Sequence, residues 1–213
     1  MNAGQRSKSR FFDRLAARWA GRGYDEDEVR RVDELMARSG IEPGMRILEP
    51  GCGPGLITRQ LAELVGPSGF VLALDLSPQM VQQCRRRTRL YPQVSVEWGA
   101  LEELCGHRGE FSLVFCCNSF PHFSDRRKAL RVVADCLVRD GRLVIAHSNS
   151  RQRVNEIHRC AGGAVKHDLL PEPATLCALV ESQGFAVTEL DDGPASFFLA
   201  AVKRQSAPLP PMI

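Results

Sequence analysis

The chain has 213 residues, of which 44% are hydrophobic and 25% charged, and its formal net charge at pH 7 is +3. These values are ordinary for a single globular domain with one sizeable core. The charge is too small to indicate a nucleic-acid partner, and no apolar run is long enough to span a bilayer. We therefore expect neither nucleic acid nor a membrane among the partners.

Two helical patterns open the chain. Residues 1–10 are polar and basic and predict a flexible tail. Residues 11–19 carry large apolar side chains at helical spacing, and residues 25–39 form a second helical pattern with an acidic start. The N-terminus lacks the apolar segment of a signal peptide, so we expect a cytoplasmic protein.

A glycine-rich turn follows the first predicted strand. An apolar run over residues 45–48 stops at Glu49, and a helical pattern begins at Leu56. Glycine permits the tight turn and lets a ligand approach the main chain, because it has no Cβ. The N–H groups at the start of the helix then face that ligand. The turn contains Gly51, Cys52, Gly53 and Gly55.

A second apolar strand, residues 70–75, ends in Asp75. Asp75 follows the glycine turn by about as many residues as separate a nucleotide-binding turn from the acid that binds the ribose. Ser77 and Pro78 predict the cap and first turn of the next helix. Nicotinamide and flavin proteins also combine a glycine-rich turn with an acid after the next strand. Glu49 before the turn and the G-x-G-x-G spacing differ from their G-x-G-x-x-G pattern.

Three more strands are predicted at residues 94–98, 111–117 and 143–146, the last after a turn at Asp140-Gly141. The continuous apolar run of 111–117 is typical of a central parallel strand buried on both faces. Its carboxyl end, which begins at Asn118, should open into the crevice where ligands bind in doubly wound sheets. A helix over 174–181 and strands over 185–190 and 196–202 follow, and residues 206–213 predict a flexible tail.

Four histidines follow the fourth predicted strand: His122, His147, His158 and His167. An imidazole can take the proton of a thiol, phenol, enol or amine as that group is methylated. Three imidazoles with Asp168 or a cysteine could instead bind a divalent metal, and capping or solvent-facing roles are a further alternative. The spacing matches no metal signature, so we predict no metal site.

The eight cysteines form no C-x-x-C pair, which favours reduced side chains packed as small hydrophobes.

The stretch from Glu49 to Gly55, together with Asp75 and residues 140–145, resembles the class I S-adenosylmethionine-dependent methyltransferases. The resemblance covers roughly residues 11–203 and is nearest to small-molecule enzymes such as the ubiquinone and menaquinone biosynthesis methyltransferases. It implies an α/β fold, a doubly wound, Rossmann-like seven-stranded sheet with helices on both faces and an antiparallel C-terminal edge hairpin. It also implies one methyltransferase domain over 11–205, whose helices at 11–39 either cover the ligands as a lid or dock as surface helices.

The resemblance further implies S-adenosylmethionine as cofactor and a small molecule as methyl acceptor. Glu49 and the backbone of the glycine turn would hold the aminoacyl end of the cofactor, Asp75 the ribose, and Asn118 would border the methyl group. The purine faces would contact Leu76, Met80 and Leu101. Many related enzymes have an aspartate at Ala100 that accepts the adenine amino group, so Glu102, a backbone carbonyl or apolar contact would replace it here.

Candidates for a proton-accepting base are His147 and His158, with His122 as a third. Two other functions stay open from the sequence. One is a non-catalytic or metal-sensing protein on a methyltransferase scaffold, suggested by the histidines and the missing adenine acid. The other is a nicotinamide-dependent oxidoreductase, which Glu49 and the Asp140-Gly141 turn fit poorly.

Overall fold

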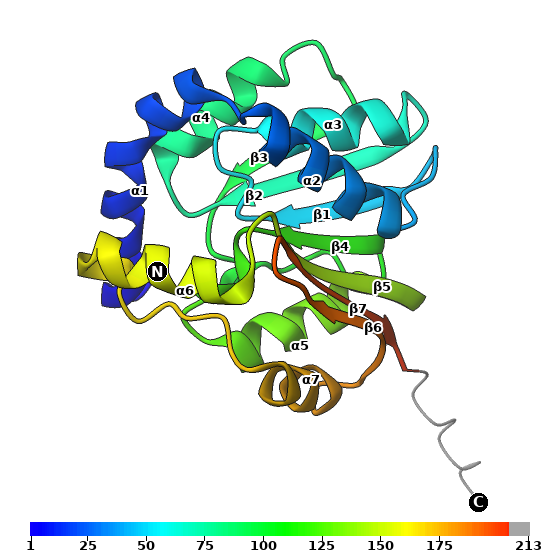
Figure 1. The fold of residues 1–213 in the computed structure, drawn as a ribbon. Helices are drawn as coiled ribbons and strands as arrows, with labels where there is room; N and C mark the ends of the chain where they lie inside the picture. The colour runs from blue at the N-terminus through cyan, green and yellow to red at the C-terminus, as the bar shows by residue number, and fades with distance from the viewer. Residues whose placement is uncertain (205–213) are drawn as a thin grey trace, which may run out of the picture.

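A computed structural model describes residues 1–204 of the chain (Figure 1). The tail predicted at 206–213 lies outside the described residues. A seven-stranded sheet with the order β3-β2-β1-β4-β5-β7-β6 forms the centre. Its strands are β1 (Arg46–Pro50), β2 (Phe70–Asp75), β3 (Val94–Trp98), β4 (Phe111–Cys117), β5 (Leu137–His147), β6 (Phe185–Asp192) and β7 (Phe197–Lys203).

The first five strands are parallel to one another, whereas β7 is antiparallel to both β5 and β6. This confirms the predicted sheet and its antiparallel C-terminal edge hairpin. The order reverses between β1 and β4, and the carboxyl ends of these two strands therefore border the crevice where doubly wound sheets bind ligands.

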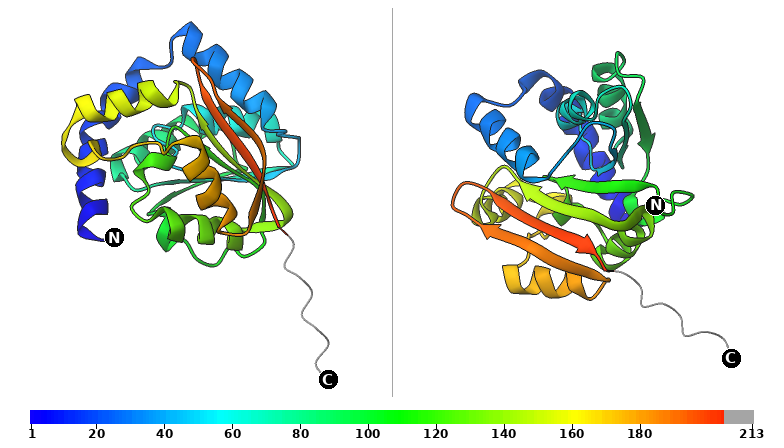
Figure 2. Two further views of the ribbon diagram at one scale, coloured as in Figure 1. Left: turned by 60° about the horizontal axis from the view of Figure 1, so that its bottom comes forward. Right: turned by 90° about the vertical axis from the view of Figure 1, so that its right-hand side faces the viewer.

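Helices cover both faces of the sheet (Figures 1 and 2). They are α1 (Ala3–Arg22), α2 (Glu26–Arg38), α3 (Leu56–Val65), α4 (Pro78–Arg87), α5 (Arg126–Cys136), α6 (Arg151–Ala161) and α7 (Pro173–Glu181), with short 3-10 helices η1 (Leu101–Glu103), η2 (Phe120–His122) and η3 (Gly163–Val165). Successive strand residues point to opposite faces, so Ile47 packs with α2 and α3 while Leu48 packs with α5 and α7. The central strand β4 is almost continuously apolar because both of its faces are buried, whereas the edge strands β3 and β6 carry polar residues and are only partly buried.

Helix α1 differs from the sequence prediction, because residues 3–10 form its first half and not a flexible tail. A capping box starts the helix: the Asn2 side chain accepts a hydrogen bond from the Gln5 N–H, and the Gln5 side chain accepts one from Asn2. Lys8 pairs with Asp168, which is too distant in sequence for the local pattern to reveal. The helix lies across the carboxyl ends of the parallel strands (Figure 1).

Within residues 1–204, no helix has both the length and the apolar character needed to cross a membrane.

All eight cysteines are free, and five of them are buried: Cys52, Cys84, Cys116, Cys117 and Cys136. This agrees with the expected packing as small hydrophobes.

Candidate functional site

Two adjoining cavities lie at the carboxyl ends of the strands, beneath α1. The first cavity is bounded by α1, the end of β2, η1 and the loop after β4. The second cavity is bounded by the glycine turn, the connection between α1 and α2, the end of β5 and α6. Five residues line both cavities: Trp19, Gly51, Gly53, Asn118 and His122. The two cavities therefore form one continuous site.

The glycine turn needs its glycines for two different reasons. Gly51 and Gly55 have φ values of 80° and 81°, and an added Cβ would lie 2.4 Å from the Ser119 Cβ and 2.8 Å from the Cys84 Sγ, respectively. Gly53 also has a positive φ, but an added Cβ would meet nothing within 4 Å. Packing therefore excludes a side chain at Gly51 and Gly55, whereas Gly53 leaves open space at the cavities.

Glu49 stands at the end of β1, on the wall of the second cavity, and is only 3% exposed. Its Oε2 is buried and has no hydrogen-bond partner among the described residues. Burial raises the pKa of this carboxyl well above its usual value, a hydrogen bond with Thr58 opposes the rise, and Asp75 adds to it. A buried carboxylate oxygen without a partner is unfavourable, so the site fits a ligand that brings a cationic donor such as an ammonium group.

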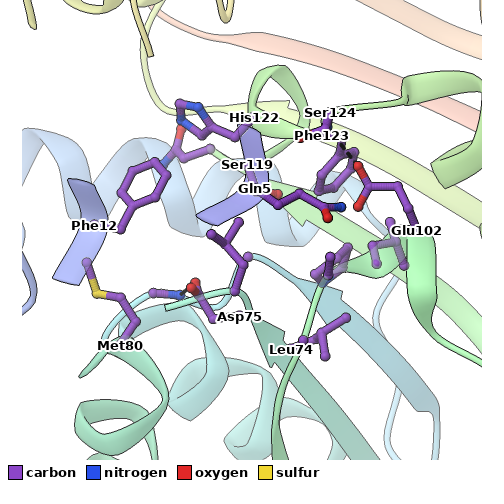
Figure 3. Close-up of a pocket in the computed structure, with 18 of the residues that line it drawn as sticks. Gln5, Phe12, Leu74, Asp75, Met80, Glu102, Ser119, His122, Phe123 and Ser124 are labelled. Carbon is purple, nitrogen blue, oxygen red and sulfur yellow. Dashed lines mark hydrogen bonds between the residues drawn. The ribbon is translucent and has the colours of Figure 1, made fainter. Parts of the chain in front are cut away.

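Asp75 ends β2 on the wall of the first cavity (Figure 3). Its Oδ2 accepts a hydrogen bond from the Gly53 N–H at 2.9 Å, and its Oδ1 accepts one from the Ser77 N–H at 2.8 Å. Burial raises the pKa of Asp75 to about 6, although these two hydrogen bonds favour the ionised form. Each carboxylate oxygen keeps lone pairs that could accept ligand hydroxyl groups.

The far end of the first cavity is mainly apolar. It is lined by Leu76, Met80 and Leu101, which the resemblance expects against the purine, and by Ala100. Glu102 lies on the same wall, where its Oε1 accepts hydrogen bonds from the N–H groups of Ser124 and Asp125 at 2.7 and 3.2 Å. Glu102 thus supplies a carboxylate next to Ala100, and it is already tied to the start of α5.

Asn118 follows β4 with a φ of 54°, in the left-handed region that asparagine tolerates better than most residues. Its Oδ1 accepts a hydrogen bond from the Ser148 N–H at 3.0 Å, and its Nδ2 donates to the Ser148 Oγ at 3.2 Å. The side chain therefore joins the carboxyl ends of β4 and β5 at the point where the two cavities meet.

Three of the four predicted histidines converge on the second cavity. His122, His147 and His158 line it, whereas His167 is exposed and does not. The ring centroids of His122 and His158 are 4.7 Å apart. His147 is buried, its Nε2 has no partner among the described residues, and burial lowers its pKa to about 3. Within residues 1–204, no group of three or more His, Cys, Asp or Glu residues is arranged to hold a metal ion.

Helix α1 contributes residues that the sequence did not assign to the site. Gln5, Phe12 and Trp19 line the first cavity, and Figure 3 shows Phe12 facing it beside His122. The spacing of Phe12 and Trp19 did indicate a helix with one buried face, which was compatible with a lid. Gln5 lies in the stretch that the sequence predicts as a tail, and its capping-box partner Asn2 is the local signal that indicates a helix there.

The comparisons with known proteins agree with this geometry. Residues 47–141 match a family model described as a methyltransferase domain. The ubiquinone biosynthesis O-methyltransferase of Xanthomonas axonopodis pv. citri is 30% identical over 167 residues, which are 70% of this chain and 67% of that protein. An uncharacterized 37.1 kDa protein in transposon TN4556 of Streptomyces fradiae is 37% identical over 135 residues, 63% of this chain.

Some curated relatives are much longer than the matched region. The chain covers 37% of the Streptomyces protein and 49% of the ubiquinone biosynthesis O-methyltransferase of Xanthomonas campestris pv. campestris. Among solved structures, the putative methyltransferase in a complex with the Haloferax volcanii Trm112 activator aligns with a TM-score of 0.77 at 20% identity, over 91% of this chain and 98% of that chain. An Aquifex aeolicus methyltransferase aligns with a TM-score of 0.72 at 18% identity, over 91% and 97%. These likenesses show the fold.

Proposed function

Because the chain belongs to the class I S-adenosylmethionine-dependent methyltransferases, we propose that it transfers a methyl group to a small-molecule acceptor by direct displacement. The cofactor of this family is S-adenosylmethionine, which supplies an activated methyl group when it is bound. The observation that carries the proposal is the unpartnered, buried Oε2 of Glu49, because the cofactor has an ammonium group that could satisfy it.

The other residues around the two cavities have complementary roles in this proposal. Asp75 accepts the ribose hydroxyls. The N–H groups of Gly51 and Gly53 donate within the protein, to Leu74 and Asp75, so the carboxylate of the aminoacyl end faces the N–H groups at the start of α3. The purine packs against Leu76, Met80 and Leu101. Glu102 takes the place of the aspartate that Ala100 replaces, which its position on the same wall supports. Asn118 borders the methyl group, where the two cavities meet.

The second cavity is the proposed acceptor site. Trp19 and Tyr24 give it aromatic walls, and His122, His147 and His158 give it imidazole nitrogens. This combination suits a small ring-bearing molecule with a polar group near the methyl donor. The protein needs only to align the two molecules, exclude water and take up a proton where the acceptor has one to lose. A cytoplasmic location remains part of the proposal.

Calorimetry with S-adenosylmethionine and S-adenosylhomocysteine tests the cofactor assignment, on protein treated with a chelator and assayed for metal. We expect micromolar binding to the wild type and a loss of about 100-fold in Asp75→Ala, because two hydrogen bonds to a charged acceptor disappear. Asp135→Ala is the matched control, since Asp135 is exposed on α5. Binding of a reduced nicotinamide and not of either cofactor form would refute the proposal. Binding that requires added metal would instead support the metal-sensing alternative.

A further inference from the structure

Asp168 connects three separate parts of the site through its carboxylate and its main-chain oxygen. Asp168 lies between η3 and α7 and is 8% exposed. Its Oδ2 is 2.8 Å from the His122 Nδ1, and its Oδ1 is 2.8 Å from the Lys8 Nζ on α1. Its main-chain oxygen accepts a hydrogen bond from the His158 Nδ1 on α6. One residue thus holds two of the histidines and the helix that covers them.

These contacts determine where the ring protons lie. Carboxylate and carbonyl oxygens only accept hydrogen bonds, so the Nδ1 atoms of His122 and His158 must both carry hydrogen. In a neutral imidazole the other nitrogen, Nε2, then has the free lone pair. Both rings line the second cavity, so two proton-accepting nitrogens belong to the proposed acceptor site.

His147 is a poor proton acceptor by comparison. Burial lowers its pKa to about 3, and the neighbouring His122 and His158 lower it further. A proton placed on this ring would therefore be unfavourable at neutral pH. The neutral His147 can orient an acceptor by a hydrogen bond, but the proton must go to the other two rings.

Lys8 completes the arrangement from α1. Besides its ion pair with Asp168, its Nζ donates a hydrogen bond to the main-chain oxygen of His122 at 2.8 Å. The positive charge of Lys8 balances Asp168, so neither histidine needs to be charged to stabilise that carboxylate. Phe12, one helical turn further along α1, packs edge-on to the His122 ring with centroids 5.0 Å apart. The arrangement therefore forms only when α1 is seated over the cavities.

We propose that Asp168 and Lys8 are positioning residues that hold His122 and His158 as neutral, Nδ1-protonated rings, so that the Nε2 of one of them receives a proton from the methyl acceptor. This inference rests on the proposed function. The acceptor loses a proton from an O–H, S–H or N–H group to Nε2, and the electron pair that it keeps forms the bond to the methyl carbon as the C–S pair remains on sulfur. A tertiary amine or thioether, which has no such proton, is excluded as acceptor.

The charged groups around His122 predict opposite changes in its pKa for two variants. The groups that face it are Lys8 on α1, Asp168, His158 on α6 and His147 on β5, and Arg126 on α5 acts on Asp168. Burial lowers the pKa of His122, the hydrogen bond to Asp168 raises it, and Lys8 lowers it. Lys8→Met should therefore raise the pKa of His122, and Asp168→Asn should lower it.

The test uses the ligand-free protein with isotope-labelled histidine, whose ring nitrogens are assigned by long-range proton–nitrogen NMR across a pH titration. We expect protonated Nδ1 and unprotonated Nε2 at His122 and His158, an upward pKa shift of His122 in Lys8→Met and a downward shift in Asp168→Asn. Lys166→Met, which removes an exposed lysine two residues from Asp168, is the control and should leave the His122 pKa in place. An Nε2-protonated His122, or a Lys8→Met variant with an unshifted pKa, would overturn the proposal.

Activity then separates this inference from the proposed function. With an acceptor in hand, Asp168→Asn should lower kcat about tenfold while the Kd for S-adenosylhomocysteine changes less than about threefold. The acid limb of the kcat profile should move to higher pH in Lys8→Met. If the wild type binds no S-adenosylhomocysteine, the proposed function fails whatever the histidine titrations show. If the wild type binds S-adenosylhomocysteine and methylates the acceptor, but the expected tautomers or pKa shifts of the histidines are absent, only the positioning role of Asp168 and Lys8 fails.

Discussion

At the scale of single residues, the glycines of the turn have similar backbone angles but are required for different physical reasons. Gly51 and Gly53 both have positive φ, but only at Gly51 does neighbouring Ser119 occupy the space of a Cβ. Packing of the protein with itself explains Gly51, whereas Gly53 is best explained by room for a ligand. The sequence predicted the turn from glycine spacing, but the spacing alone could not separate these two reasons.

The matched pair Gly51→Ala and Gly53→Ala tests this distinction. Left-handed backbone costs about 1 kcal/mol for alanine, so Gly53→Ala should lose about that much stability. Gly51→Ala adds a clash with Ser119 and should lose about 3 kcal/mol in all. Denaturant unfolding measures both values, and calorimetry should show that Gly53→Ala nevertheless weakens S-adenosylhomocysteine binding at least about tenfold. Equal stability losses, or unchanged binding in Gly53→Ala, would contradict the assignment.

At the scale of elements, most of the fold could be predicted because its signals are local. Apolar runs predicted the strands, and caps such as Ser77 and stops such as Gly40 predicted helix ends close to the observed ones. Two elements differed. The turn expected at Asp140-Gly141 lies inside β5, where Asp140 has a φ of 59° and the strand continues. The polar first half of α1 has no apolar pattern because its contacts are long-range ion pairs and hydrogen bonds.

The apolar contact of α1 is made by Phe12, which packs with Ala16 against Met80 and Val165. Phe12→Ala should loosen α1 from the rest of the molecule, because deletion of a buried ring removes a large apolar contact. Hydrogen exchange should show amides of α1 exchanging about 10- to 100-fold faster, with β4 amides unchanged. Phe11→Ala is the control on the same helix, since Phe11 is only partly buried and should have a smaller effect. Uniformly faster exchange across α1 and β4 would mean that α1 does not open independently.

At the scale of the whole molecule, a hydrophobic cluster lies on each face of the sheet, and the site lies at the carboxyl ends of the strands between them. Several ionisable groups are consequently buried, Asp75 and Glu49 among them. The sequence predicted Glu49 and Asp75 as site residues because each stands at the end of an apolar run, and the structure places both at the cavities. It could not identify Asp168 and Lys8 as partners of His122, because only the fold brings these three residues together.

The raised pKa of Asp75 predicts how global stability depends on pH. The folded pKa is about 6 and the unfolded value is 3.8, so the folded state binds the proton more tightly. The stabilising contribution is present below about pH 4 and is lost as the pH rises through 6, by about 3 kcal/mol in total. The unfolding free energy of the wild type minus that of Asp75→Ala should fall by this amount across that range. A difference that rises with pH, or stays flat, would show that Asp75 is not destabilised by burial.

The Lys8–Asp168 pair also bears on how the chain matures on the ribosome. The glycine turn, β2 and β4 are synthesised before Asp168, so the parts that would hold the cofactor can begin to assemble early. Lys8 is made earlier still, yet its partner emerges only after β5 and α6. Until then α1 can pack on Met80 of α4 but lacks its ion pair with Asp168, so a nascent chain could bind cofactor without holding the histidines in place. The ability to bind the cofactor would thus arise earlier in translation than the ability to hold the histidines for proton transfer.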